Sequence, residues 1–83
     1  MKLTFTHHAH EAMKIREIPE EWVYHTVQNP LLRTQDPFDQ TVERFYNKIQ
    51  ELDQRVLRVA VNTHKQPWTV VTVFLDRTMR DKL

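Results

Sequence analysis

The stretch that decides the fold is residues 41–75, TVERFYNKIQELDQRVLRVAVNTHKQPWTVVTVFL. Apolar and polar residues alternate along three parts of it, 41–49, 55–62 and 68–75, and short polar connectors separate these parts. Such alternation is typical of strands with one buried face, and short connectors join neighbouring strands antiparallel. The stretch therefore predicts an antiparallel meander. Because the chain contains no glycine, we expect type I turns or short loops between the strands.

Three histidines crowd the predicted start of a first helix. Thr6 is a candidate N-cap, because its hydroxyl can accept a hydrogen bond from a free backbone N–H of the first turn. His7, His8 and His10 then lie in that turn. Since imidazole titrates near neutral pH and also binds metals, this cluster is a candidate for proton transfer or for metal binding.

A second helix and a short strand are expected between the first helix and the meander. Pro19 suits the first helical position, and Asn29-Pro30 ends the helix. Residues 31–34 are expected to form an edge strand. The order of helix, helix and strands predicts an α+β domain, with two N-terminal helices packed on one face of an antiparallel, mostly meander sheet.

Composition limits both the architecture and the chemistry. A chain of 83 residues, of which 40% are hydrophobic, suffices for a single domain spanning residues 1–83. The absence of cysteine excludes disulfides and thiolate metal sites, and the absence of glycine excludes glycine-rich phosphate loops. No basic-then-apolar leader pattern and no apolar run of about 20 residues occur, so we expect a cytoplasmic protein without membrane contact.

The charges are segregated along the chain, although the net charge is only +1. Residues 1–43 carry four Lys or Arg against seven Asp or Glu, and residues 44–83 carry eight against four. The net charge is thus −3 for residues 1–43 and +4 for residues 44–83, so the sequence is compatible with one basic face. Residues 76–83 hold three of these cations and are expected to form a mobile basic tail that contacts RNA backbone or frays.

Strand parity divides the meander into a core face and an open face. The open face is expected to hold Arg44, Tyr46, Lys48, Arg58 and Thr72. Guanidiniums, an aromatic ring and hydroxyl donors are groups that bind phosphate and stack on a base, so this face is a candidate RNA-binding surface. The expected core positions of the last strand are Val71, Val73 and Leu75.

Short motifs run through nearly the whole chain. They are Thr6-His7-His8-Ala9, then Met13, Arg16, Ile18 and Val23, and a closing Val71-Thr72-Val73-Phe74. With these motifs the chain resembles a small family of domains of unknown function, which is similar in turn to the RelE and ParE toxin superfamily. Two positions depart from the family pattern, because Glu17 stands where its glycine would fall and Ala12 precedes Met13 where an arginine is common.

The resemblance implies a RelE-like fold and a toxin-like endoribonuclease that needs no metal and no cofactor. In such an enzyme the 2′-hydroxyl of the RNA is the nucleophile. By position in the family pattern, His8 would act as general base or acid, and Arg16 and Arg58 would stabilise charge on phosphorus. The remaining expected site residues are Tyr46, as a stacking or proton-donating group, and Arg44, Lys48 and Thr72, as substrate-binding groups.

The partners implied by this resemblance are RNA, ribosome-associated RNA included, and a cognate antitoxin protein. Alternatives from other classes stay open: a ParE-like toxin that acts on a protein target, or a non-catalytic protein-interaction module. A basic concave site would favour RNA, whereas a flat apolar patch would favour protein. A metal site would need the histidine cluster together with a distant ligand such as His25 or His64.

Structural roles are a competing interpretation of the same side chains. A histidine at a helix start can simply cap or pack there, an aromatic ring can pack in the core, and threonine is common in any strand. Arginines can pair with neighbouring carboxylates instead of binding a ligand. The pairs expected on this interpretation are Arg16 with Glu20, and Arg44 and Arg58 with Glu43 and Asp53.

Overall fold

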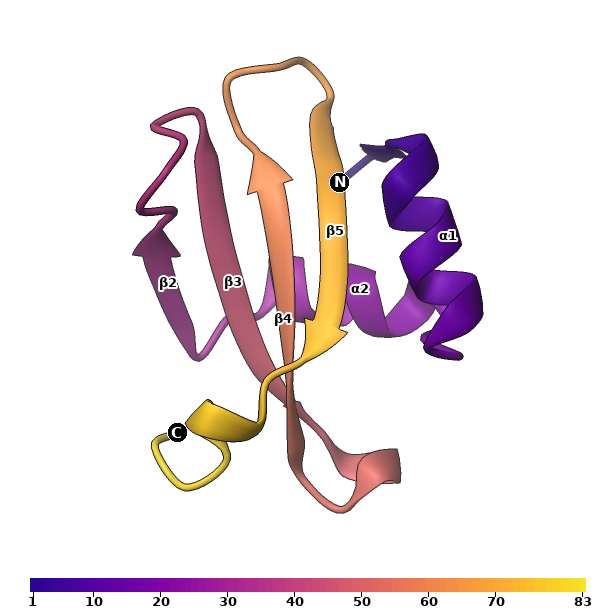
Figure 1. Cartoon of the computed structure of the whole chain (residues 1–83), viewed down its shortest axis with the longest axis vertical. Coiled ribbons are helices and arrows are strands. Elements are labelled where there is room, and N and C mark those ends of the chain that lie inside the picture. Colours follow the sequence, from indigo (N-terminus) through magenta and orange to yellow (C-terminus); the bar gives the residue numbers. More distant parts are fainter.

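Three strands lie where the alternating stretch predicts them. In the computed structural model, which describes residues 1–83, β3 (Val42–Ile49), β4 (Arg55–Asn62) and β5 (Trp68–Leu75) pair antiparallel in that order. β2 (Leu32–Gln35) adds an edge strand beside β3. The predicted meander and edge strand are therefore confirmed (Figure 1).

β1 (Leu3–Phe5) is a strand that the sequence did not indicate. It pairs parallel with β5, so the sheet order is β1-β5-β4-β3-β2. The expectation of an antiparallel sheet is therefore wrong at this edge, and the sheet is mixed. A strand of three residues is too short to show a clear alternation, which explains why the sequence did not reveal it.

The start of α1 (His7–Ile15) is fixed by the predicted cap. The backbone N–H of Ala9 donates to the Thr6 hydroxyl oxygen at 3.0 Å, and that hydroxyl donates to the carbonyl of Val71 at 3.1 Å. The cap therefore also anchors the helix to β5. After the helix, Glu17 has a φ of +55°, the left-handed conformation that favours glycine. Glu17 thus adopts the backbone conformation expected of the family's glycine.

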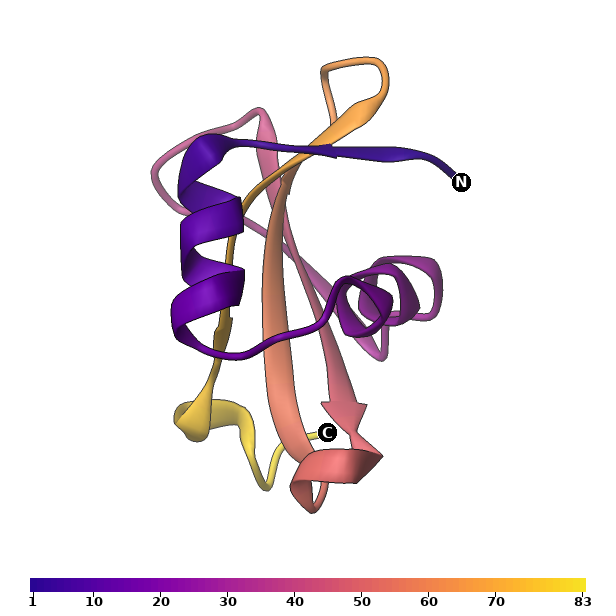
Figure 2. The same cartoon turned by 90° about the vertical axis from the view of Figure 1, so that its right-hand side faces the viewer.

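The two helices occupy different positions on the sheet. α2 (Glu20–Gln28), for which Pro19 is the N-cap instead of the first helical residue, lies across one face of β3 and β4. α1 runs alongside β5, beyond the part of its edge that β1 covers (Figures 1 and 2). The expected helix layer is thus formed on the face by α2, and α1 flanks it at the margin. The opposite face of the sheet carries no helix (Figure 1).

One core joins both helices to the sheet. Burial of these aliphatic and aromatic side chains is the main source of stability in a domain of this size. The fully buried members include Ala9 of α1, Val23 of α2, Phe45 of β3, Leu57, Val59 and Val61 of β4, and Val70 and Val73 of β5.

The core of β5 differs from the predicted one. Val73 is buried as expected, but Val70 is buried in place of Val71, and Leu75 is only half-buried. The pairing of β4 with β5 shifts register in the middle of the two strands. Such an irregularity adds one residue to the alternation, so every position before it changes face. A simple period of two could not reveal it.

The chain after β5 is folded against the sheet. Asp76 donates its backbone N–H to the carbonyl of Val56 at 2.8 Å, and its carboxylate accepts hydrogen bonds from the Thr78 N–H at 3.0 Å and hydroxyl at 2.6 Å. A short 3₁₀ helix, Arg77–Met79, follows. The expected mobile tail is therefore corrected to an ordered turn. No helix of the chain has the length and apolar character to cross a membrane.

Candidate functional site

The open face brings together the residues that strand parity assigned to it. Tyr46 of β3 is paired with Arg58 of β4, which is paired with Phe74 of β5. In the next row, Arg44 is paired with Ala60, and Ala60 with Thr72. The pairing thus places Arg44, Tyr46, Arg58 and Thr72 on one face, and both arginines are already engaged with carboxylates of the protein.

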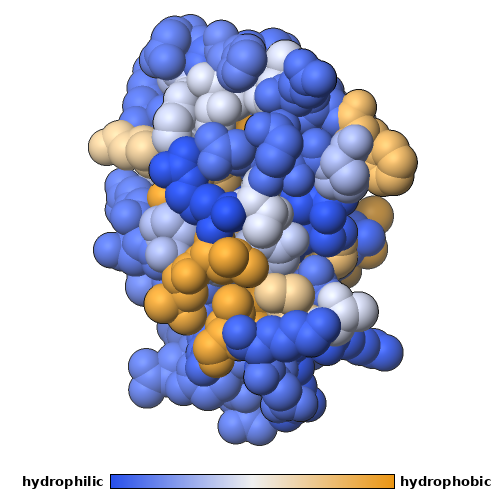
Figure 3. Space-filling view, turned by 90° about the vertical axis from the view of Figure 1, so that its left-hand side faces the viewer, coloured by the Kyte–Doolittle hydropathy of each residue, from blue (hydrophilic) through white to orange (hydrophobic).

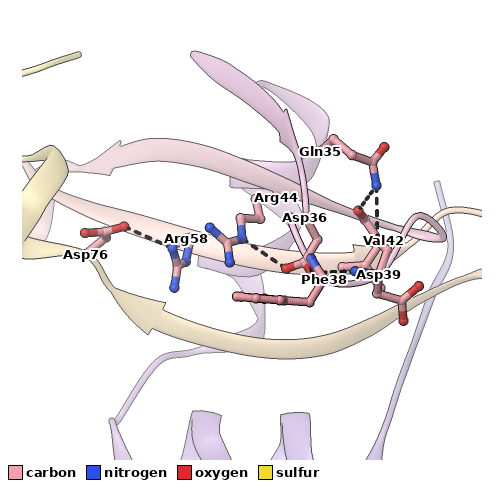
Figure 4. A network of polar contacts seen from close by, with 8 residues as sticks. All are labelled: Gln35, Asp36, Phe38, Asp39, Val42, Arg44, Arg58 and Asp76. Atoms are coloured by element: carbon pink, nitrogen blue, oxygen red, sulfur yellow. Dashed lines mark hydrogen bonds and ion pairs between the residues drawn. The ribbon is translucent and has the colours of Figure 1, made fainter.

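Arg58 is held by two neighbours. Its Nη1 lies 3.4 Å from Oδ2 of Asp76 (Figure 4). Its Cζ lies 3.9 Å from the centre of the Phe74 ring. The side chains of Arg58 and Asp76 are only 20% and 8% exposed. The charge of this guanidinium is therefore largely compensated, and its carboxylate partner is Asp76 instead of the expected Asp53.

Arg44 is engaged in the same way at the other end of the face. Its Nε donates to Oδ1 of Asp36 at 3.1 Å, instead of pairing with Glu43 (Figure 4). The backbone N–H of Phe38 is the main cause of a lowered pKa at Asp36; burial opposes it, and the N–H of Asp39 and the charge of Arg44 add to it. Asp36 is therefore an ionised partner at neutral pH.

The other predicted substrate contacts are partly covered. Tyr46 is only 4% exposed, so its ring packs in the fold and offers no face to a base. Thr72 and Lys48 are half-buried. Lys48 lines a separate hollow between α2 and the end of β3, where Trp22 and His25 also lie.

His8 lies outside the open face. It is exposed in the first turn of α1, whereas Arg16 lies just beyond the last turn. Eight residues of helix span about 12 Å at roughly 1.5 Å per residue, so His8 and Arg16 lie at opposite ends of α1. His7 lies 3.7 Å from Glu11. No group of three or more His, Cys, Asp or Glu side chains is placed to hold a metal ion.

The end of the sheet below these residues carries a group of arginines that we call the arginine cluster: Arg16, Arg55, Arg77 and Arg80. They line two adjoining hollows. Arg16 lines the first hollow and Arg80 the second. Arg55, Leu75 and Arg77 line both. Phe74, which stacks on Arg58, lines the first hollow. Three segments distant in sequence thus converge on one basic surface.

The charge of the arginine cluster is largely uncompensated. Arg16, Arg55 and Arg77 have no carboxylate oxygen within 4.0 Å, so Arg16 does not form the expected pair with Glu20. Arg80 lies 3.8 Å from Asp53, but these side chains are 57% and 95% exposed, so the interaction is weak. The carboxylate that lines the hollows is Asp76, which is occupied by Thr78 and Arg58.

The sequence identified Arg16 and the basic end of the chain, but it missed Arg55. A signal was present, because Arg55 begins β4 and Arg77 lies two residues after the end of β5. The starts and ends of antiparallel neighbours lie side by side. Because β4 and β5 are antiparallel, the start of β4 lies beside the end of β5, and this alignment places both arginines at one end of the sheet.

A family model described as "Domain of unknown function (DUF4258)" matches residues 5–75. The match includes both helices, β2 to β5, and two members of the arginine cluster, Arg16 and Arg55. Arg77 and Arg80 lie beyond it. No curated protein and no solved structure matches the chain.

Proposed function

This chain belongs to the DUF4258 family of domains of unknown function, and we propose that it is a RelE-like, toxin-type domain that binds RNA and cleaves it. The observation that carries the proposal is the arginine cluster. Its guanidiniums converge on adjoining hollows, and three of them have no carboxylate partner. A basic concave surface of this kind is what distinguishes an RNA site from a flat apolar interface.

The chemistry of the cluster suits phosphodiesters. A guanidinium is always charged and presents N–H donors in a planar fork that fits two phosphate oxygens. Arg55 and Arg77 line both hollows, so they are placed to contact neighbouring phosphates of one strand. Binding would release counterions from the RNA and would weaken as salt rises.

For cleavage, the 2′-hydroxyl oxygen would attack the adjacent phosphorus and the bond from phosphorus to the 5′-oxygen would break. The products are a 2′,3′-cyclic phosphate and a 5′-hydroxyl, and the proton passes from the 2′-oxygen to the leaving 5′-oxygen. Arg16 and Arg55 would stabilise the charge that builds on the phosphate oxygens. Arg58 is less suited to this role because Asp76 already pairs with it.

Protein binding at the β2 edge is a second candidate function. Leu31, which directly precedes β2, is 57% exposed, and Figure 3 shows a group of apolar side chains low on the side of the molecule that carries β2. β2 is the last strand of the sheet, and an exposed strand edge can accept a further strand from a partner. We propose this edge as the contact surface for an antitoxin.

The test is induced expression in bacteria, with growth and RNA 5′ ends followed in the same cultures. The variant Arg16→Ala/Arg55→Ala/Arg77→Ala removes the unpaired guanidiniums. Lys2→Ala/Lys14→Ala/Lys65→Ala is the matched control, because it removes the same charge from other exposed positions. His8→Ala tests the proton-transfer role of that residue separately.

We expect growth arrest and new 5′-hydroxyl ends with the wild type and the control, and neither with the arginine variant at equal protein level. Growth arrest without new RNA ends would contradict cleavage and favour a protein target. Absence of both arrest and new ends in the wild type would contradict the toxin proposal. Loss of cleavage in His8→Ala would show that His8 transfers a proton although it lies outside the arginine cluster.

A further inference from the structure

Phe38 is the most exposed large apolar side chain of the chain, with 93% of it accessible. It lies in the loop between β2 and β3. Single exposed apolar residues are common on protein surfaces and need no explanation by themselves. Phe38 differs because its loop holds it in one position beside the arginines of the open face.

The loop is fixed by an unusual density of hydrogen bonds. One oxygen of Asp36 accepts from the backbone N–H groups of Phe38 at 2.9 Å and Asp39 at 3.0 Å. Asp39 accepts from the N–H and the hydroxyl of Thr41 at 2.9 and 2.6 Å, and the amide of Gln35 donates to the Asp39 carbonyl at 3.1 Å. The backbone on both sides of Phe38 is therefore held in place, and its ring stays in solvent (Figure 4).

A line of arginine and aromatic side chains connects this loop to the arginine cluster, and the two arginines between them, Arg44 and Arg58, are each paired with a carboxylate. Arg44 donates to the carboxylate that also holds the N–H of Phe38. Arg44 and Arg58 are diagonal neighbours on adjacent strands, about 7–8 Å apart. Arg58 stacks on Phe74, which lines the first hollow of the cluster. No helix covers this face (Figures 1 and 4).

We propose that Phe38 is a stacking platform for an unpaired base of single-stranded RNA whose backbone is held by the arginine cluster; this inference rests on the proposed RNA binding. Sites for single strands combine a positive groove with aromatic rings on which bases stack. Bases inside a duplex offer no free face to such a ring. The substrate class is therefore single-stranded RNA that runs from the cluster, past Arg58 and Arg44, to Phe38.

The test is fluorescence anisotropy with a labelled single-stranded RNA about 12 nucleotides long and with the same sequence annealed to its complement. The variants are Phe38→Ala, which removes the ring, and Phe38→Trp, which restores a stacking surface. Ile15→Ala is the control, because it truncates another exposed apolar side chain that belongs to neither proposed binding surface. Circular dichroism verifies that each variant is folded.

We expect Phe38→Ala to weaken single-strand binding by about tenfold, while Phe38→Trp and Ile15→Ala bind like the wild type. Binding of the duplex should not change in any variant. The stacking role is overturned if the wild type binds RNA and Phe38→Ala binds the single strand equally well, or if Phe38→Ala weakens binding of the duplex as much as binding of the single strand. Contact with a protein partner would then be the remaining role for the exposed ring of Phe38. If the wild type binds neither RNA, the proposed RNA binding itself fails, and the stacking role fails with it.

Discussion

The open face and the arginine cluster hold the same type of side chain in two different electrostatic states. On the open face each guanidinium has a carboxylate partner, Asp36 for Arg44 at 3.1 Å and Asp76 for Arg58 at 3.4 Å. In the arginine cluster, three of the four guanidiniums have none within 4.0 Å. Residue type alone does not separate these states, because both sets are arginines.

The difference follows from burial. The side chains of Arg44 and Arg58 are 23% and 20% exposed, and a charge that is partly removed from water needs a partner to remain stable. Arg16, Arg77 and Arg80 are exposed and remain hydrated, so they need no carboxylate partner, whereas Arg55 is half-buried and still has none. The paired arginines should therefore matter for stability and the unpaired ones for binding.

Removal of Asp76 should have the largest effect on stability. Asp76→Ala leaves Arg58 without its carboxylate and removes two hydrogen bonds to Thr78, so we expect the free energy of unfolding to fall by about 3 kcal/mol. Urea denaturation measures it. Asp81→Ala, at an exposed carboxylate without an ion pair, is the control and should change little. A loss below about 1 kcal/mol would show that Asp76 is not a structural partner.

A direct comparison of two arginines sharpens the distinction. Arg58→Ala removes the stacking on Phe74 and leaves Asp76 buried and unpaired, so we expect a loss of about 2 kcal/mol in urea denaturation. Arg77→Ala, an exposed residue without an ion pair, should cost less than about 0.5 kcal/mol. Equal losses for both variants would contradict the separation into structural and binding arginines.

Much of the fold was predictable because it depends on local patterns. The three alternating segments gave β3, β4 and β5, and Thr6 marked the start of α1. β1 and the register shift in β5 were not predictable in this way, because both depend on pairing between distant segments. Parity placed Arg44, Arg58 and Thr72 on one face, but it did not show that Tyr46 is buried, that Lys48 lines the hollow beside α2, or which carboxylates lie near the arginines. That information comes from loops and chain ends, which supply Asp36 and Asp76.

The paired end of the open face should also be sensitive to acid. The pKa of Asp36 is lowered in the folded protein, chiefly by the N–H of Phe38. The ionised carboxylate therefore stabilises the fold at pH values above the pKa of an unfolded Asp, about 3.9. This stabilisation is lost as the pH falls through the lower pKa of the folded protein. Asp36→Asn should therefore flatten the decrease in Tm between about pH 5 and pH 2.

Part of the decrease in Tm should remain in Asp36→Asn, because the pKa of Asp39 is also lowered, chiefly by the Thr41 hydroxyl. Asp81→Asn is the control, at a carboxylate that forms no ion pair. If the Tm of Asp36→Asn fell with pH as steeply as that of the wild type down to about pH 2, a charged role for Asp36 would be contradicted. In the wild type, titration of Asp36 should not make RNA binding depend on pH near neutrality, because Asp36 is ionised throughout that range.

The most direct test of the account is the salt dependence of RNA affinity for the wild type, for Arg16→Ala/Arg55→Ala/Arg77→Ala and for the lysine control. Each lost phosphate contact to a single strand lowers the slope of log K against log salt by about 0.7, so the arginine variant should have a slope smaller by about 2. The lysine control should keep the wild-type slope. Equal slopes for the arginine variant and the wild type would show that RNA is not held at the arginine cluster.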